Sequence, residues 1–245
     1  MKDIVSDKAD HDNPDNQTKA APEVNQDNID FGFRTVQRSA KVGLVRGVFN
    51  SVASRYDLMN DLMSGGVHRL WKEAMIDWMA PQSHQKLVDL AGGTGDISMR
   101  FLRNGGGVAC ITDINQAMLQ AGRSRHDLQR LASQISWCVA NAESLPFDSQ
   151  IADFVTMAFG LRNITDRQAA LSEAYRILKP GGRFLCLEFS HVQTRLIAKL
   201  YHNWSFKVLP VMGQVVAGDA DSYRYLAESI RTFPTKEVLA DMLAQ

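Results

Sequence analysis

The stretch LVDLAGGTGD, residues 87–96, decides the fold class of this chain. Its first part is a short apolar run and its second part a glycine turn, which is typical of a buried strand that turns sharply into a helix. Gly93 and Gly95 allow the tight turn and let a ligand approach where a Cβ would collide. A glycine turn alone does not choose the ligand, so the interpretation depends on the rest of the chain.

Apolar runs like the one before this turn recur along the chain and alternate with helical patterns. The predicted strands are Lys86–Ala91, Val108–Ile114, Ile135–Ala140, Asp153–Phe159 and Arg183–Phe189. The predicted helices between them are Asp96–Arg103, Gln116–Leu131 and Asp166–Leu178. Alternating strands and helices indicate βαβ units, and near-continuous apolar strands indicate a sheet covered on both faces. We therefore predict an α/β fold with a Rossmann-like, doubly wound parallel sheet of strand order 3-2-1-4-5.

Composition places the chain among globular proteins with a sizeable core. Of its 245 residues, 45% are hydrophobic and 22% charged, and the formal net charge is zero. A neutral chain has no general attraction to polyanions, so no nucleic-acid partner is expected. Cys110, Cys138 and Cys186 are far apart, which predicts reduced core thiols and no metal site. No apolar run reaches the ~18 residues of a membrane span, and the polar N-terminus is no secretory signal, so we expect a cytoplasmic protein.

The domain organisation follows from where large apolar residues begin. Residues 1–30 carry three Lys against seven Asp and one Glu and hold few large apolar groups, which predicts a disordered acidic tail. Residues 31–245 then form one domain. We divide it into an N-terminal helical cap (31–80), a cofactor-binding core (86–190) and a helical substrate or membrane region (191–245).

Acidic residues around the glycine turn bear on the ligand. The third glycine of a dinucleotide fingerprint is replaced by Ser98, and Asp89 and Asp96 would repel a pyrophosphate. Both acids suit a ligand with positive charge, such as S-adenosylmethionine. Asp113, at the end of the second strand, is placed to accept hydrogen bonds from both ribose hydroxyls of an adenosine. NAD would satisfy Asp113 equally well, so that residue indicates adenosine without choosing the cofactor.

Further polar residues follow later strands. Asn141 and Ala142 end the third strand beside an apolar Leu-Pro-Phe segment, as recognition of an adenine edge and face requires. Residues 178–182, LKPGG, are predicted to end the preceding helix. Their simplest interpretation is a structural turn, because Pro and Gly favour turns. All of these candidates fall at strand carboxyl ends. That order is typical of class I methyltransferases, and we expect S-adenosylmethionine as the cofactor.

Several longer stretches resemble one family. They are FGFRTV at 31–36, FNSVASRYDLMNDLMSGGVHRLWK at 49–72, TDIN at 112–115, FGLRN at 159–163 and GDADSYRYLAESIR at 218–231. Over about residues 31 to 245 the chain resembles the ubiquinone/menaquinone biosynthesis C-methyltransferase family. The resemblance implies transfer of a methyl group to a ring carbon of demethylmenaquinol or of 2-methoxy-6-polyprenyl-1,4-benzoquinol. It also implies peripheral contact with the inner membrane or with a quinone-biosynthesis complex.

The resemblance assigns the cofactor contacts by position. They fall on Thr94 of the glycine turn next to Gly93, on Asp113, and on the pair Asn141 and Ala142. A further family contact comes from a serine just before the FGLRN block, and here that position is Ala158. The loss of one hydroxyl would weaken a polar contact by ~0.5–1.5 kcal/mol, so cofactor affinity is expected to fall without vanishing.

No catalytic residue is assigned by the sequence. Arg162 and Asn163 follow the fourth strand, where Arg162 could hold a phenolate and Asn163 could orient a quinol hydroxyl. The alternative is that Asn163 caps the helix starting near Asp166 and that Arg162 forms a structural ion pair. Weaker candidates are Tyr56, His68, His202 and Tyr223.

Two other function classes stay open on the sequence. One is a nicotinamide oxidoreductase, and the other is a non-catalytic methyltransferase-like fragment. The family continues beyond Gln245 with a strand pair that closes the sheet, so we expect an open edge at the fifth strand, low stability and low activity.

Residues 195–212 mix large apolar residues with Arg195, Lys199 and Lys207, which predicts a lipid-surface helix or a prenyl tunnel. A helix packed on the core is the alternative.

Overall fold

The computed structural model describes residues 27–53, 56–190, 203–208, 210–211, 214 and 219–244. Its strands are β1 (Asn28–Phe31), β2 (Arg34–Gln37), β3 (Lys86–Asp89), β4 (Val108–Asp113), β5 (Ile135–Val139), β6 (Ala152–Ala158) and β7 (Leu178–Leu187). The longer helices are α1 (Arg38–Val52), α2 (Tyr56–Ser64), α3 (His68–Met79), α4 (Asp96–Arg103), α5 (Gln116–Arg123), α7 (Arg167–Ile177), α10 (Ala220–Arg231) and α11 (Lys236–Leu243). Shorter turns of helix are α6 (His126–Gln129), η2 (Ala132–Gln134), η3 (Leu161–Asn163) and η4 (Trp204–Val208).

Five parallel strands form the central sheet in the order β5-β4-β3-β6-β7. Numbered from the first strand of the sheet, this is the predicted order 3-2-1-4-5, which is confirmed. Leu87 of β3 pairs with Ala109 of β4 on one side and Phe154 of β6 on the other. Strand order reverses between β3 and β6, and crevices at such a reversal bind ligands in open α/β sheets.

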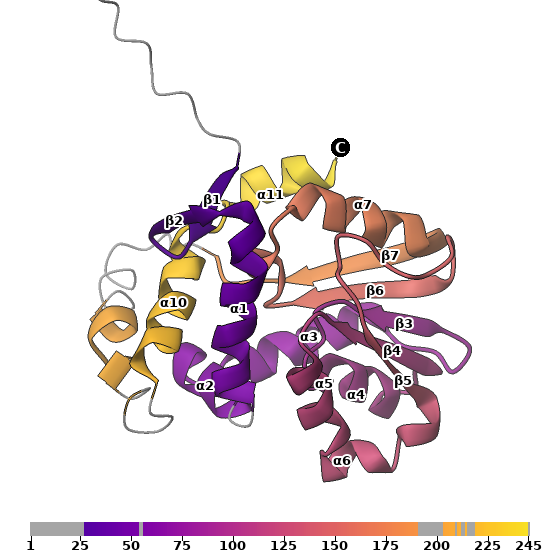
Figure 1. Cartoon of the computed structure of the whole chain (residues 1–245). Coiled ribbons are helices and arrows are strands. Elements are labelled where there is room, and N and C mark those ends of the chain that lie inside the picture. Colours follow the sequence, from indigo (N-terminus) through magenta and orange to yellow (C-terminus); the bar gives the residue numbers. More distant parts are fainter. Residues whose placement is uncertain are drawn as a thin grey trace, which may run out of the picture.

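Helices cover both faces of the sheet (Figure 1), because successive strand residues point to opposite sides. Leu87 and Phe154 belong to a core that they share with α3 and α4. Val88 and Val155 belong to the opposite core, packed by α7 and joined by residues of α11. The free thiols of Cys110, Cys138 and Cys186 lie on β4, β5 and β7.

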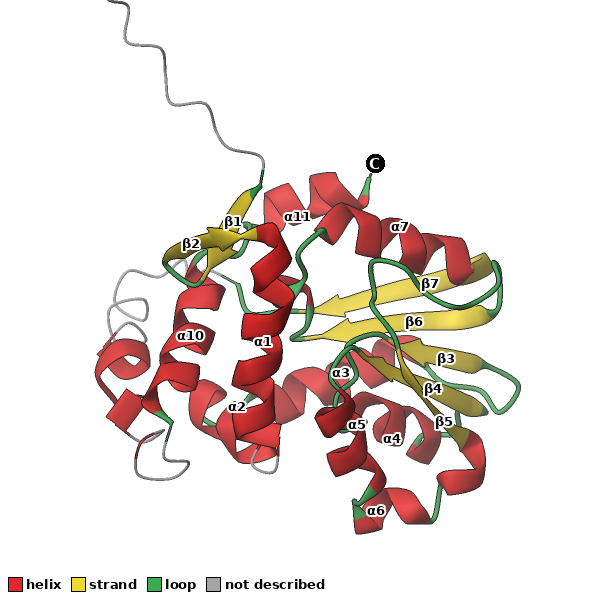
Figure 2. Cartoon of the chain, in the orientation of Figure 1, coloured by secondary structure: helices red, strands yellow, loops and turns green. Residues whose placement is uncertain are grey.

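A third core joins the hairpin β1–β2 with α1, α2 and α10. Figure 2 shows these helices gathered at the ends to which the arrows of β6 and β7 point. Phe159, just after β6, and Phe189, just after β7, are part of this core together with Tyr223, whose exposed fraction is 0%. The core therefore holds a cap over the carboxyl ends of the strands.

The structure corrects several predicted boundaries. The tail predicted over residues 1–30 ends too late, because Asn28–Phe31 form β1; residues 1–26 lie outside the described part of the chain. The helix predicted over Gln116–Leu131 is interrupted at Arg125, whose backbone is extended and whose guanidinium pairs with Asp127. The Pro-Gly-Gly turn lies inside the irregular start of β7, where Gly181 has φ +79°.

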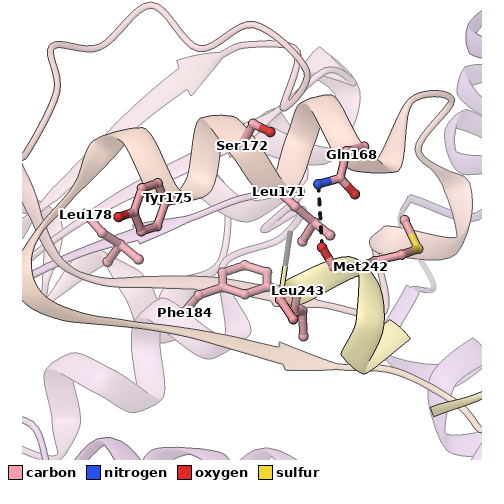
Figure 3. Close-up of a pocket in the computed structure, with 9 residues that line it drawn as sticks. Gln168, Leu171, Ser172, Tyr175, Leu178, Phe184, Met242 and Leu243 are labelled. Carbon is pink, nitrogen blue, oxygen red and sulfur yellow. Dashed lines mark hydrogen bonds between the residues drawn. The ribbon is translucent and has the colours of Figure 1, made fainter. Parts of the chain in front are cut away.

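Strand β7 is an edge of the sheet among the described residues, where it pairs only with β6. Beside it lies an apolar groove between α7 and α11 (Figure 3). Its lining residues are Gln168, Leu171, Ser172, Tyr175, Leu178, Phe184, Met242, Leu243 and Ala244. Gln168 Nε2 donates to Met242 O at 3.5 Å and links the two helices. Within the described ranges, no helix is both long and apolar enough to cross a bilayer.

Candidate active site

A cavity lies under α1 at the carboxyl ends of β3, β4 and β6, where the strand order reverses. It is walled by residues of α1, α2 and α5, by the glycine turn after β3, by the end of β4 and by the segment after β6. These residues are Val45, Arg46, Phe49, Tyr56, Ala91, Gly93, Asp113, Ile114, Asn115, Met118, Phe159, Gly160, Asn163 and Ile164. Most of the wall is apolar, and a few polar groups converge on it. Such a composition is typical of a small-molecule site.

Asp113 is the acidic group of this cavity. Its Oδ2 accepts a hydrogen bond from Gly93 N at 3.0 Å, and its Oδ1 accepts one from Asn115 N at 2.8 Å. Burial raises the pKa of Asp113 to about 6, although the two backbone donors act in the opposite direction. Among the described residues no lysine or arginine forms an ion pair with it. A carboxylate held in this way is suited to accept hydrogen bonds from neutral hydroxyl groups.

The glycine turn brings the backbone of β3 to this carboxylate. Gly93 has φ +54°, and a Cβ added there would lie 3.0 Å from Met118 Cε on the cavity wall. Thr94 is buried and lies in a neighbouring open hollow with Tyr56 and Arg125. The Oγ1 of Thr94 accepts a hydrogen bond from Arg125 Nη1 at 3.5 Å. Gly93 thus lines the Asp113 cavity directly, whereas Thr94 faces the adjoining hollow.

A second pocket continues from the cavity toward the end of β5. Asn141, Ala142 and Glu143 line it. The residues that it shares with the Asp113 cavity are Val45, Ala91, Ile114, Asn163 and Ile164. Asn141 Oδ1 accepts from Glu143 N at 3.1 Å, which fixes the amide in its turn. The predicted cofactor residues of β4 and β5 therefore lie along one continuous wall.

Residues 34–245 match the sequence model of the ubiE/COQ5 methyltransferase family. The chain belongs to this family. A protein of Cereibacter sphaeroides called ubiquinone/menaquinone biosynthesis C-methyltransferase UbiE is 56% identical over 214 residues, which cover 87% of this chain and 86% of the relative. A protein of the same name from Acidiphilium cryptum is 55% identical over 221 residues, covering 90% and 89%.

Solved structures agree on the fold of the family. A SAM-dependent methyltransferase of Thermotoga maritima, described as a possible histamine N-methyltransferase, superposes with TM-score 0.56 at 20% identity, covering 81% of this chain and 78% of the other. A putative S-adenosylmethionine-dependent methyltransferase of Methanococcus maripaludis gives TM-score 0.55 at 14% identity, covering 80% and 83%. Family membership makes the chain a methyltransferase, and the nicotinamide oxidoreductase interpretation is excluded.

Arg162 and Asn163, the substrate-side candidates, occupy different places in this methyltransferase. The Arg162 side chain has an exposed fraction of 0%, and its Nη1 lies 2.9 Å from Glu188 Oε2 and donates to Phe159 O at 2.6 Å. Its Nε and Nη2 have no hydrogen-bond partner among the described residues. Asn163 lines the cavity. The ion-pair alternative for Arg162 is confirmed, whereas the helix cap assigned to Asn163 belongs to Asp166, which accepts from Ala169 N at 3.0 Å.

The expectation that Asp89 and Asp96 serve a cationic ligand is wrong, because both carboxylates are engaged within the fold. Asp89 is fully buried and accepts from Ser98 Oγ at 2.9 Å and Thr156 Oγ1 at 2.8 Å. Asp96 pairs with the buried Lys72 at 2.8 Å. Ser98, which replaces the third glycine of a dinucleotide fingerprint, is therefore the partner of a buried acid.

Of the weaker catalytic candidates that the structure describes, Tyr56 alone lines the cavity. Tyr56 lines both the cavity and the neighbouring hollow. Burial raises the pKa of its hydroxyl to about 12. His68 is buried against Asp61 at 2.9 Å, Tyr223 belongs to the cap core, and His202 lies outside the described residues. The sequence predicted a helical cap over residues 31–80, but no local signal showed that its helix α1 covers the cavity with Val45 and Phe49.

Asp113 makes a testable contribution to pH-dependent stability. The pKa of Asp113 is about 6 in the folded protein, above the 3.8 of an unperturbed aspartate, so the folded state binds this proton more tightly than the unfolded state. Its contribution to stability is complete below about pH 4 and is lost as the pH rises past about 6. Relative to an Asp113→Ala variant, wild type should gain about 1–3 kcal/mol between pH 7 and pH 4. Urea unfolding of both proteins across this range measures the gap, and a constant gap would contradict the assignment.

Proposed function

We propose that this enzyme transfers a methyl group from S-adenosylmethionine to a ring carbon of a polyprenylated quinol in ubiquinone and menaquinone biosynthesis. The substrates would be demethylmenaquinol and 2-methoxy-6-polyprenyl-1,4-benzoquinol. The observation that carries the proposal is 56% identity, over 87% of the chain, to relatives named for C-methylation in these pathways. The apolar cavity around Asp113 supports it, because the cofactor and a quinone ring beside it both need apolar walls with few polar contacts.

The residues of the cavity fit S-adenosylmethionine. When bound, this cofactor supplies a methyl group on a positively charged sulfur. Asp113 would accept from the ribose hydroxyls, with its two oxygens already oriented by Gly93 N and Asn115 N. Asn141 and Ala142 would hold the adenine in the second pocket. Thr94 would contribute from the adjoining hollow.

The protein's own contribution to the reaction is positioning and charge control. A quinol ring carbon becomes nucleophilic when the neighbouring hydroxyl ionises, and an N–H donor beside that oxygen favours ionisation. Asn163 is the side chain placed on the cavity wall to donate in this way. Arg162, paired with Glu188, holds the turn η3 that carries Asn163. Apolar walls exclude water, and alignment of the two reactants supplies most of the acceleration.

The proposed function can be tested in a bacterial strain that lacks this methylation step. Expression of the chain should convert accumulated demethylmenaquinone into menaquinone, measured by mass spectrometry of the extracted quinones. The purified protein should transfer labelled methyl groups to a short-chain demethylmenaquinol. An unchanged quinone pool together with an inactive but folded purified protein would overturn the proposal.

Membrane contact is part of the proposal, because a polyprenyl quinol resides in the bilayer. In the region proposed for it, Arg195, Lys199 and the leucines at 196, 200 and 209 lie outside the described residues. Trp204 Nε1 donates to Leu62 O at 3.0 Å, and Phe206 stacks on Phe33 at 5.8 Å between ring centroids. The described part of the region therefore packs on the cap and leaves Trp204 37% exposed.

Flotation with vesicles tests this contact. Wild type should be recovered with anionic vesicles and much less with neutral ones, because basic residues are interleaved with the apolar ones. Trp204→Ala should reduce recovery severalfold. Trp78→Ala, which removes an exposed tryptophan of α3, is the matched control and should behave as wild type. Absence of wild-type recovery, or equal recovery of wild type and Trp204→Ala, would leave this region with a packing role alone.

A further inference from the structure

The side-chain amide of Asn163 has a defined orientation in the cavity wall. One edge of the amide faces Phe159 O, 3.4 Å from Nδ2, and the other faces Tyr225 Oη, 3.0 Å from Oδ1. A carbonyl oxygen can only accept, so the edge toward Phe159 must be the NH₂ group. The oxygen of the amide then faces Tyr225, and the Tyr225 hydroxyl must be the donor.

Tyr225 is built into the cap in a way that fixes its hydroxyl. It lies on α10 with 5% of its surface exposed, and its ring stacks on Phe31 with centroids 4.1 Å apart. Burial raises the pKa of Tyr225 to about 12, so the hydroxyl keeps its proton throughout the neutral range. Tyr225 is not among the residues that line the cavity. Its effect on a ligand must therefore pass through Asn163.

The amide has one donor left for a ligand. Its bond to Phe159 O is long, and the second hydrogen of Nδ2 has no acceptor within the described part of the chain. Without the Tyr225 hydroxyl, a half-turn of the amide would be opposed by this long bond and by the approach of Oδ1 to Phe159 O, but no longer by a donor that holds Oδ1 in place. The turned amide would present its oxygen to the cavity, where it would repel an ionised quinol oxygen.

We propose that Tyr225 is a positioning residue, which by donating to Asn163 Oδ1 aims the Asn163 Nδ2 donor at the quinol oxygen next to the carbon that receives the methyl group. This inference rests on the proposed function. It links the cap helix α10 to the chemistry at the end of β6. It also gives the hydroxyl of Tyr225 a role separate from the packing role of its ring.

The substitution Tyr225→Phe isolates the hydroxyl, because the stack on Phe31 and the buried volume are kept. We expect kcat to fall roughly three- to tenfold, with cofactor affinity and melting temperature close to those of wild type. The acid limb of the pH–kcat profile should move to higher pH by roughly half to one unit, since a poorly aimed donor stabilises the ionised quinol less. Tyr175→Phe, an exposed tyrosine on α7, is the matched control and should change neither quantity.

A double-mutant cycle with Asn163→Ala completes the test. If Tyr225 acts through Asn163, the double variant should be no slower than Asn163→Ala alone, and both should show the same shifted acid limb. Additive losses, or a Tyr225→Phe variant with the kcat and pH profile of wild type, would overturn the inference while leaving the proposed function intact. Failure of wild type to methylate any quinol would overturn the proposed function and this inference with it.

Discussion

Replacing Glu188 with alanine is expected to lower the free energy of unfolding by about 3–5 kcal/mol, because it leaves the Arg162 guanidinium uncompensated in the core. The exposed fractions of the two side chains are 0% for Arg162 and 3% for Glu188. Glu188 also accepts from the backbone N of Arg162 at 3.3 Å. After its removal, the partners left to the cation among the described residues would be the Phe159 carbonyl and the face of Phe189, whose ring centroid lies 5.5 Å from Arg162 Cζ.

Thermal and urea unfolding measure this effect. For a domain of this size the melting temperature should fall by roughly 6–20 °C. The double variant Arg162→Met/Glu188→Met, which removes both charges, should recover most of the loss. Asp221→Ala, which breaks the exposed pair of Asp221 with Arg224, should cost less than about 1 kcal/mol. A Glu188→Ala protein as stable as wild type would show that the buried pair does not hold η3.

The second large effect concerns the cofactor. Asp113→Ala should weaken S-adenosylmethionine binding by at least about a hundredfold, because it removes two charge-assisted hydrogen bonds to the ribose, each worth roughly 1.5–3 kcal/mol. The variant should remain folded, since only two backbone donors lose their partner and both border the cavity. Calorimetric titration with S-adenosylmethionine measures the loss. Asp77→Ala, at an exposed acid of α3, is the matched control.

Asp113→Asn refines this experiment, because it keeps the side-chain volume and one acceptor oxygen. Its affinity should lie between those of wild type and Asp113→Ala. Unchanged affinity in a folded Asp113→Ala protein would mean that the cofactor residues are wrongly assigned. It would not affect family membership, which rests on the whole chain.

The sheet was predictable because its signals are local. Each strand is an apolar run with turn residues at its ends, and α4 begins and ends where predicted, at Asp96 and Arg103. The hairpin β1–β2 was not predictable. Its strands NIDF and RTVQ are short and mostly exposed, and the hairpin is anchored by Phe31 stacking on Tyr225 near the other end of the sequence. No local pattern contains that contact.

The candidate site divides in the same way. Strand-end position alone identified Asp113 and Asn163, which the structure brings to one cavity. The same argument wrongly assigned Asp89 to a cationic ligand, because the sequence does not show that this carboxylate accepts a hydrogen bond from Thr156 inside the sheet. Glu188 and Tyr225 were missed, since each acts through a partner on another element.

The attachment of α1 has a kinetic consequence. Three polar contacts join this helix to the loops beyond the strands: Lys41 Nζ to Ile164 O at 3.3 Å, Asn115 Nδ2 to Arg46 O at 3.4 Å, and Arg38 to Asp166 at 3.5 Å. All three are longer than the usual N–H···O distance, while the same helix carries Val45 and Phe49 of the cavity wall. Local opening costs least where anchoring contacts are weak, so an opening of α1 would begin at these three contacts and would have to overcome the burial of Val45 and Val52 in the third core. Release of the demethylated cofactor would then be limited by the rate at which α1 opens. That rate, rather than the rate of methyl transfer, would set the turnover rate.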